Sequence, residues 1–233
     1  PKMFEFDPSK QILFEDNHLV IINKLPAQII QGDKTGDTPL SESIKEYLKK
    51  KYNKPGRVFL GVVHRIDRPA SGAVIFARTS KALARLNEML RKNEIRKTYW
   101  IITAKKPDPI SGTLEDHLWK YEKKNKSFVV AEKKKGAKKA VLNYTLKQSV
   151  GNSYLIEVEL QTGRHHQIRV QFGNIGCPVM GDVKYGYPNA NEKPFIHLHA
   201  RQLSFIHPVT KKNMTLSASP PPDKHWDQYI DAE

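Results

Sequence analysis

The segment VFLGVVHRIDRPASGAVIFA, Val58–Ala77, contains two apolar runs separated by a charged link. The runs are Val58–Val63 and Ala73–Ala77, and near-continuous apolar runs of this length are typical of strands buried on both faces of a sheet. Pro69 and Gly72 lie in the link, where both residue types favour a turn. The segment therefore predicts two buried strands joined by a turn whose polar residues lie at a sheet edge or a cleft rim.

Asp67 is the acidic residue of this link, and Arg65 and Arg68 lie on either side of it. Two nearby guanidinium groups favour the ionised form of a carboxyl group. An ionised carboxylate in a fixed position can act as a nucleophile, a base or a metal ligand. The same three residues can equally form a structural Asp–Arg pair that stiffens the turn, and the residues alone leave both interpretations open.

Strand patterns outnumber helix patterns in the rest of the chain. Ile12–Glu15 and His18–Lys24 are separated by two residues, as in a tight hairpin. Further strands are expected over 97–104, 139–150, 156–160, 195–200, 202–206 and 213–217, and helices are expected after Thr38, after Ser80 and from about His165. These patterns favour an α+β fold with a mixed, largely antiparallel central sheet flanked by helices, and we expect one domain over 1–233.

The chain carries 39 Lys and Arg residues against 24 Asp and Glu residues, which gives a formal net charge of +15. Because 39% of the residues are hydrophobic, this is a folded protein rather than a basic disordered tail. A strongly basic folded chain points to a polyanion as partner, either nucleic acid or an anionic membrane surface. Apolar runs such as Leu19–Ile22 are far shorter than the ~20 residues of a membrane-spanning helix, so we expect no membrane partner.

Two further features bear on location and on binding. Cys177 is the only cysteine, so no disulfide can form within the chain, which fits a reducing compartment such as the cytoplasm. Lys120–Lys139 holds nine lysines and two glutamates, a local charge of 9 − 2 = +7. We expect this segment to form a basic strand–loop–strand arm that contacts RNA, with a merely solvated loop as the alternative.

A second and a third segment combine basic residues with glycine. In Gln161–Arg169, the residues Arg164 and Arg169 lie at the expected start of a helix, an arrangement that suits an anion. Gly176–Gly186 follows that helix as a glycine-rich loop.

These three segments together resemble the RluA-type family of RNA pseudouridine synthases. The family's central motif, His-Arg-Leu-Asp-Arg followed by Ser-Gly, is similar to His64–Gly72, with Ile66 in place of Leu. Other patterns of the family match Glu15–Lys24, Thr162–Arg169, Gly176–Gly186 and Leu198–Pro208. Because five motifs occur in the same order over nearly the whole chain, the resemblance is specific.

The resemblance implies that the chain isomerises uridine in structured ribosomal or transfer RNA to pseudouridine, with Asp67 as the essential carboxylate. It implies that Arg169 pairs with Asp67 and that Tyr99 stacks on the uracil and can move a proton. Arg65 would fill the gap left when the target nucleotide is extruded from the RNA. Side chains expected to pack on the extruded ring are Leu198 or Ile196, and those expected to contact RNA are Arg65, Arg68, Arg164, His166, Lys133, Lys134 and Lys135.

The resemblance also implies no cofactor, because the reaction moves the ribose bond from a ring nitrogen to a ring carbon without net oxidation. The sequence contains no phosphate-cradling glycine loop and no dinucleotide-binding fingerprint. We expect a monomeric catalytic domain that has no room for the small N-terminal RNA-binding module of many relatives. Which RNA and which uridine are modified is left open.

Two other function classes compete with this interpretation. A metal hydrolase would use His197 and His199 on one strand face together with His165, His166 and Cys177, but no spacing matches a known zinc pattern, and we expect no metal. A non-catalytic RNA-binding protein would explain the charge equally well, but it would give no reason for the combination of Asp67, Tyr99 and Arg169.

Overall fold

The computed structural model describes residues 5–229, which form two compact units. The first unit comprises 5–96 and 200–220, and the second comprises 97–199 and 221–229. Each unit is built on antiparallel strand pairs with few helices, which confirms the expected α+β class. Within the described residues, no helix is both long enough and apolar enough to cross a membrane.

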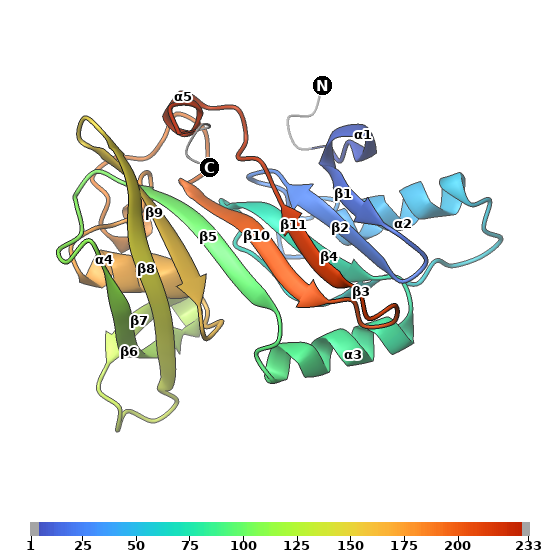
Figure 1. The fold of residues 1–233 in the computed structure, drawn as a ribbon, viewed down its shortest axis with the longest axis horizontal. Coiled ribbons are helices and arrows are strands. Elements are labelled where there is room, and N and C mark those ends of the chain that lie inside the picture. Colours follow the sequence, from blue (N-terminus) through green and yellow to red (C-terminus); the bar gives the residue numbers. More distant parts are fainter. Residues whose placement is uncertain (1–4, 230–233) are drawn as a thin grey trace. The chain divides into compact units, whose positions relative to one another are not determined.

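The sheet of the first unit has the strand order β1-β2-β4-β10, with β3 added beside β4 and β11 beside β10 (Figure 1). The strands of this unit are β1 (Ile12–Glu15), β2 (Leu19–Lys24), β3 (Gly61–Val62), β4 (Ser71–Ala77), β10 (Leu198–Ile206, from Ala200 onward in this unit) and β11 (Asn213–Ser217). Its helices are α1 (Pro8–Gln11), α2 (Leu40–Lys51) and α3 (Ser80–Arg91).

Strands β2 and β4 are buried on both faces because a helix covers each face. Alternate residues such as Ile21 and Ile75 pack with Leu86 of α3. The residues between them, such as Ile22 and Phe76, pack with α2. All seven residues of β4 are buried, which confirms the prediction for 73–77.

The second unit has the strand order β5-β9-β8-β6-β7, with antiparallel pairing throughout this series. Its elements are β5 (Arg96–Thr103, from Lys97 in this unit), β6 (Ser111–Tyr121), η1 (Glu122–Lys124), β7 (Lys126–Val130), β8 (Lys138–Val150), β9 (Ser153–Leu160), α4 (Gln167–Asn174), η2 (Val183–Tyr185) and α5 (Lys224–Asp227). A small core of Leu118, Ala140, Val170 and Tyr185 joins β6, β8, α4 and η2.

Several local predictions are wrong in detail. Only Gly61–Val62 of the expected strand 58–63 pairs with β4, and the two strands expected over 195–206 are a single strand. The N-cap of α3 is Thr79 rather than Ser80, because the Thr79 side chain accepts the hydrogen bond from Ala82 N. The N-cap of α2 is Pro39, without a side-chain hydrogen bond, rather than Thr38.

Candidate active site

The turn that carries Asp67 is built on a buried lysine. Lys24 ends β2 with no exposed surface, and its Nζ donates hydrogen bonds to the carbonyl oxygens of Leu25 (2.9 Å), Arg68 (3.1 Å) and Ala70 (2.7 Å). The turn also closes on itself, since Ala70 N donates to Asp67 O (3.0 Å). The backbone on the C-terminal side of Asp67 is therefore held from inside the unit.

The charge of Lys24 is sensitive to this environment. Burial lowers the pKa of Lys24 to about 7, and the negative charge of Asp67 acts in the opposite direction. The Asp67 carboxylate thus lies close enough to oppose the effect of burial on Lys24. The sequence gives no role to Lys24, and the one signal for its role is that it ends an apolar strand.

Gly72 closes the turn where no other residue fits. Its φ of +121° is unfavourable for residues with a side chain, and an added Cβ would collide with the backbone N and O of Ala200. The close approach of the two backbones places Ser71 and Gly72 directly against β10 in the first unit. This requirement fixes the path of the chain after Asp67.

The two arginines of the turn have different surroundings. Arg65 is exposed and Asp67 is half-buried. The guanidinium group of Arg68 forms ion pairs with Asp37 and, at 3.6 Å, with Asp33. The structure therefore directs Arg68 to the loop before α2, a pairing that sequence reasoning missed.

Arg169 lies in the second unit, on α4, and is 5% exposed. Its Nε donates to Asp182 Oδ2 (2.8 Å) and its Nη2 donates to Asp182 Oδ1 (2.9 Å). Asp182 is 1% exposed, so this is a buried, two-pronged ion pair. Asp182 was missed by sequence reasoning, although it stands in the glycine-rich loop Gly176–Gly186. The expected pairing of Arg169 with Asp67 stays a prediction.

Tyr185, which lies against the Arg169 guanidinium group, is joined by hydrogen bonds to the basic arm. The Arg169 guanidinium lies 5.1 Å from the centre of the Tyr185 ring. Tyr185 Oη accepts from Ser127 N (2.9 Å) on β7 and lies 2.7 Å from His166 Nδ1. His165 Nδ1 lies 2.7 Å from Ser127 Oγ. The arm is therefore fastened to the start of α4 through side chains.

His166 is an internal part of this hydrogen-bond network. It is 9% exposed, and its φ of 53° is in the left-handed region. Burial lowers the pKa of His166 far below its usual value, and the charge of Arg169 adds to the effect, so the ring is neutral at neutral pH. Tyr185 Oη, which accepts from Ser127 N, also lies within hydrogen-bond distance of His166 Nδ1 (2.7 Å). The predicted RNA contact of His166 stays a prediction, and the structure gives this ring an internal partner.

The other basic candidates of the second unit lie at its surface. Arg164 is exposed, and its Nε donates to Lys139 O (2.8 Å). Lys133, Lys134 and Lys135 are exposed in the turn between β7 and β8. These positions leave the four charges accessible to a large anion.

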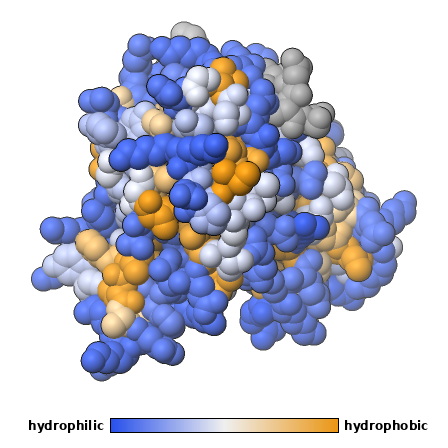
Figure 2. Space-filling view, turned by 60° about the vertical axis from the view of Figure 1, so that its left-hand side comes forward, coloured by the Kyte–Doolittle hydropathy of each residue, from blue (hydrophilic) through white to orange (hydrophobic). Residues whose placement is uncertain are grey.

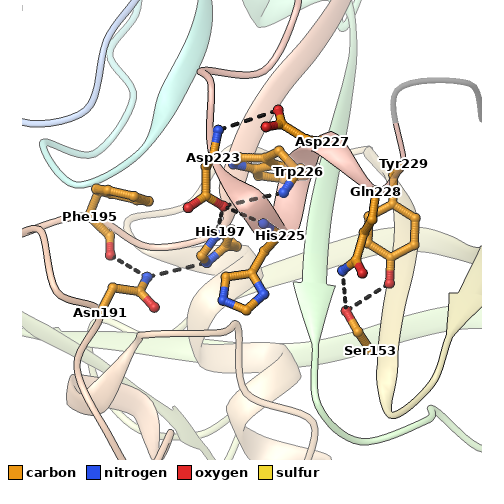
Figure 3. Close-up of polar contacts among 10 residues, drawn as sticks. All are labelled: Ser153, Asn191, Phe195, His197, Asp223, His225, Trp226, Asp227, Gln228 and Tyr229. Atoms are coloured by element: carbon orange, nitrogen blue, oxygen red, sulfur yellow. Dashed lines mark hydrogen bonds and ion pairs between the residues drawn. The ribbon is translucent and has the colours of Figure 1, made fainter.

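Three of the apolar candidates are buried in the second unit. Tyr99 on β5 is 8% exposed and lies opposite Val158 of β9, while Ile196 and Leu198 are 6% and 4% exposed. Ile196 and Leu198 flank His197, which lies at the centre of the contacts in Figure 3.

His197 is held on both ring nitrogens. Asn191 Nδ2 lies 3.2 Å from His197 Nδ1, and His197 Nε2 lies 2.7 Å from Asp223 Oδ2. The same Asp223 oxygen accepts from the backbone N of His225 and Trp226 at the start of α5 (Figure 3). Both nitrogens thus have protein partners, so His197 is a structural residue and not the metal ligand considered above. We call Asn191, His197, Asp223 and α5 the C-terminal clasp.

The structure thus gathers the candidates into two groups. Arg65, Asp67 and Arg68 share one turn of the first unit, and Tyr99, Arg164, His166, Arg169, Ile196, Leu198 and the three lysines belong to the second unit. The first group supplies a carboxylate on an anchored turn. The second supplies a guanidinium group in a fixed orientation, which can stabilise negative charge.

Residues 18–174 match the sequence profile of the RNA pseudouridylate synthase family. The chain is 34% identical to an uncharacterized RNA pseudouridine synthase of Synechocystis sp. over 224 residues, which cover 94% of this chain and 67% of that protein. It is 33% identical to ribosomal large subunit pseudouridine synthase C of Buchnera aphidicola, covering 94% and 69% of the two chains. Its fold is similar to that of human RNA pseudouridylate synthase domain containing 4, with a TM-score of 0.79, 22% identity, and coverage of 95% and 92%.

Proposed function

Because this chain belongs to the RNA pseudouridylate synthase family, we propose that Asp67 is the carboxylate with which it converts specific uridines of structured RNA to pseudouridine. The chain is an RNA pseudouridine synthase, an isomerase that acts on RNA. The observation that carries the role of Asp67 is the anchored turn, in which a half-buried carboxylate is followed by backbone that Lys24 holds from inside. Such an arrangement orients a reacting group at no cost during the reaction.

The chemistry needs a group that can attack or accept a proton. The bond between ribose and a uracil nitrogen breaks, the base rotates, and the ribose joins a ring carbon. That carbon releases its proton, and the freed nitrogen takes up a proton in its place. No electrons are gained or lost, so we propose that no cofactor takes part. An ionised Asp67 serves either as nucleophile or as base.

The remaining roles follow from the surroundings of each side chain. Arg169 is held by Asp182, so its guanidinium group keeps one direction and can pair with the carboxylate of Asp67. Tyr99 stacks on the uracil and moves a proton. Ile196 or Leu198 packs on the extruded ring, and Arg65, which is exposed, takes the place of the extruded nucleotide.

We further propose that the substrate is ribosomal RNA, with transfer RNA as the alternative, since two relatives, of Buchnera aphidicola and Zymomonas mobilis, are named ribosomal large subunit pseudouridine synthases. The exposed groups that contact its phosphates are Arg65, Arg164, Lys133, Lys134 and Lys135. Arg68 and His166 come second, because Arg68 is ion-paired with Asp37 and His166 is buried. Both units together form one catalytic domain, which works as a monomer in the cytoplasm.

The test replaces Asp67 by asparagine, which keeps the shape of the side chain and removes its charge. RNA labelled with tritium on the reacting ring carbon releases the label when that carbon bonds to ribose. We expect Asp67→Asn to release no label while its RNA affinity and unfolding midpoint stay close to wild type. The matched control is Asp108→Asn, an exposed carboxylate on the loop after β5, which should react normally. Label release by Asp67→Asn at a rate near wild type contradicts the proposal.

A further inference from the structure

Three aromatic side chains lie on one face of the β6–β7 hairpin, where the arm begins. Trp119 and Tyr121 lie two residues apart on β6, with ring centres 5.6 Å apart and planes 21° apart. Phe128 lies directly opposite Trp119 on β7, with ring centres 6.4 Å apart. Because side chains alternate along a strand, the three rings share one face. We call Trp119, Tyr121 and Phe128 the aromatic patch.

The aromatic patch is not part of the core. Leu118, the neighbour of Trp119, is buried on the other face of β6 against Val170 and Tyr185. Phe128 is 37% exposed, and Trp119 and Tyr121 are half-buried. The other two tryptophans, Trp100 and Trp226, are 3% and 1% exposed. The core of this unit therefore does not explain why large rings occupy the outer face of a lysine-rich hairpin.

Figure 2 views the molecule from the side that carries β6 to β9 in Figure 1, and hydrophobic residues appear there among strongly hydrophilic ones. On the arm the hydrophilic residues are mainly lysines. Lys134 Nζ lies 4.2 Å from the centre of the Trp119 ring, and Lys126 Nζ lies 5.3 Å from that of Phe128. Both ammonium groups lie over the ring faces as cation–π contacts. A ligand that is both planar and anionic can take their place on the rings while its negative charge keeps the lysines close.

RNA nucleotides have this combination, since each carries a flat base and a phosphate. Proteins that bind single-stranded nucleic acid commonly pair aromatic platforms with basic grooves. We propose that the aromatic patch is a second RNA-binding site, on which an unpaired base of the substrate stacks while Lys126 and Lys134 contact its flanking phosphates. The proposal rests on the proposed function in one respect, namely that the ligand is the RNA substrate.

The anchoring of the arm gives this site a defined position. Ser127, next to Phe128, contacts His165 and Tyr185, and Tyr185 lies beside Arg169. Asn125, just before β7, also contacts His165. A base stacked on the aromatic patch is therefore held at a fixed distance from Arg169. The site would thus help to select RNA in which an unpaired nucleotide lies at that distance from the target uridine.

The experiment measures binding of single-stranded oligouridylate to the full chain at several salt concentrations. We expect Trp119→Ala and Phe128→Ala each to weaken binding about 5- to 100-fold. Stacking releases no counterions, so the dependence of affinity on salt should keep the wild-type slope. Trp119→Phe is the matched control, because it keeps a ring and should bind nearly as wild type.

Tryptophan fluorescence gives a second measurement. Because Trp100 and Trp226 are buried, oligouridylate should quench chiefly the emission of Trp119, and Trp119→Phe should lose this response. Wild-type affinity of Trp119→Ala and Phe128→Ala at every salt concentration, or an emission that RNA leaves unchanged, overturns the proposal. Quenching by anionic phospholipid vesicles but not by RNA also overturns it, in favour of a membrane surface.

The outcome is independent of the test of Asp67. Quenching requires no turnover, so Asp67→Asn should bind and quench as wild type does. If Asp67→Asn proves active while the stacking variants bind weakly, the catalytic proposal fails and the binding site stands. If Asp67→Asn is inactive and the stacking variants bind normally, the catalytic proposal stands and the aromatic patch is not an RNA-binding site.

Discussion

Lys24 connects the interior of the first unit to the turn that carries Asp67. Its three hydrogen bonds reach one carbonyl next in sequence and two that lie 44 and 46 residues away. A buried ammonium group is unfavourable unless such acceptors surround it. Lys24 is therefore a positioning residue: burying its charge costs desolvation energy, and its hydrogen bonds hold the turn that carries Asp67.

Replacing Lys24 by methionine keeps the length of the side chain and removes all three hydrogen bonds. The carbonyl groups of Arg68 and Ala70 then lose a charged partner, so we expect kcat to fall by more than tenfold while the KM for RNA changes little. The measurement is label release over a range of RNA concentrations. Lys50→Met, an exposed residue on α2, is the control. A wild-type kcat in Lys24→Met would mean that the turn does not depend on this anchor.

The same variant tests the titration of Lys24. Its pKa is about 7 in the folded protein against a usual 10.5, so between these values the unfolded state binds more protons. Stability should therefore rise with pH in this window, because the cost of the buried charge disappears as Lys24 loses its proton. We expect the free energy of unfolding of wild type, relative to Lys24→Met, to increase from pH 7 to pH 10 in urea titrations. A difference that stays constant over that range contradicts the assignment.

At the scale of elements, the C-terminal clasp positions the segment that carries Ile196 and Leu198. Asp223 serves two elements at once, since it caps α5 and accepts from His197. Although burial acts in the opposite direction, the hydrogen bond from His197 lowers the pKa of Asp223. Burial also lowers the pKa of His197.

Asp223→Ala should destabilise the protein by about 1–2 kcal/mol at pH 7, the usual cost of losing an N-cap and its hydrogen bonds. Because the pKa of Asp223 is lower in the folded protein than in the unfolded chain, its carboxylate stabilises the folded state fully at pH values above the unfolded pKa. This stabilisation is lost as the pH falls through the folded pKa. The advantage of wild type over Asp223→Ala should therefore shrink below about pH 4. Urea unfolding at pH 7 and pH 3 measures the difference in the free energy of unfolding between wild type and Asp223→Ala. Asp227→Ala is the control, because Asp227 Oδ1 accepts only a long hydrogen bond from Asp223 N (3.4 Å). An equal difference at both pH values would rule out the charge of Asp223 as the cause.

At the scale of the whole molecule, the net charge of +15 governs how the protein meets RNA. Basic groups that neutralise phosphates release counterions, so affinity falls steeply as salt rises. Such contacts orient the RNA without reading its bases. The lysine-rich turn and the aromatic patch lie on the same arm, yet they should respond differently to salt.

Replacing Lys133, Lys134 and Lys135 together by alanine should weaken binding to all RNAs about equally. The log–log salt slope should flatten by about 2–3 if all three contact phosphates, while the rate at saturating RNA stays near wild type. Affinity measured at several salt concentrations checks this, with a triple change at the exposed Lys49, Lys50 and Lys54 as control. An unchanged slope in the arm variant would locate the phosphate contacts elsewhere on the protein.

The sequence alone determined the features that depend on local periodicity and on single-residue conformation. The two apolar faces of β2 and β4, the hairpin of β1 and β2, and the strand at 213–217 follow from alternating or continuous apolar residues. The backbone at position 72 has a positive φ that only glycine adopts easily, so the glycine in the sequence already indicated the turn. Strand β6 was missed, and β7 was expected only as part of a strand–loop–strand arm over 120–139, because lysines interrupt the apolar alternation over 117–130.

Only the tertiary structure decided which charged groups meet. Asp182 forms an ion pair with Arg169, 13 residues away, and Asp37 with Arg68, 31 residues away, because the chain between the partners, helices included, folds back. The three carbonyls around Lys24 and the row of Trp119, Tyr121 and Phe128 likewise depend on strand register and side-chain direction. A sequence records which residues carry charge or rings, whereas their partners depend on the path of the chain between them, which distant packing determines.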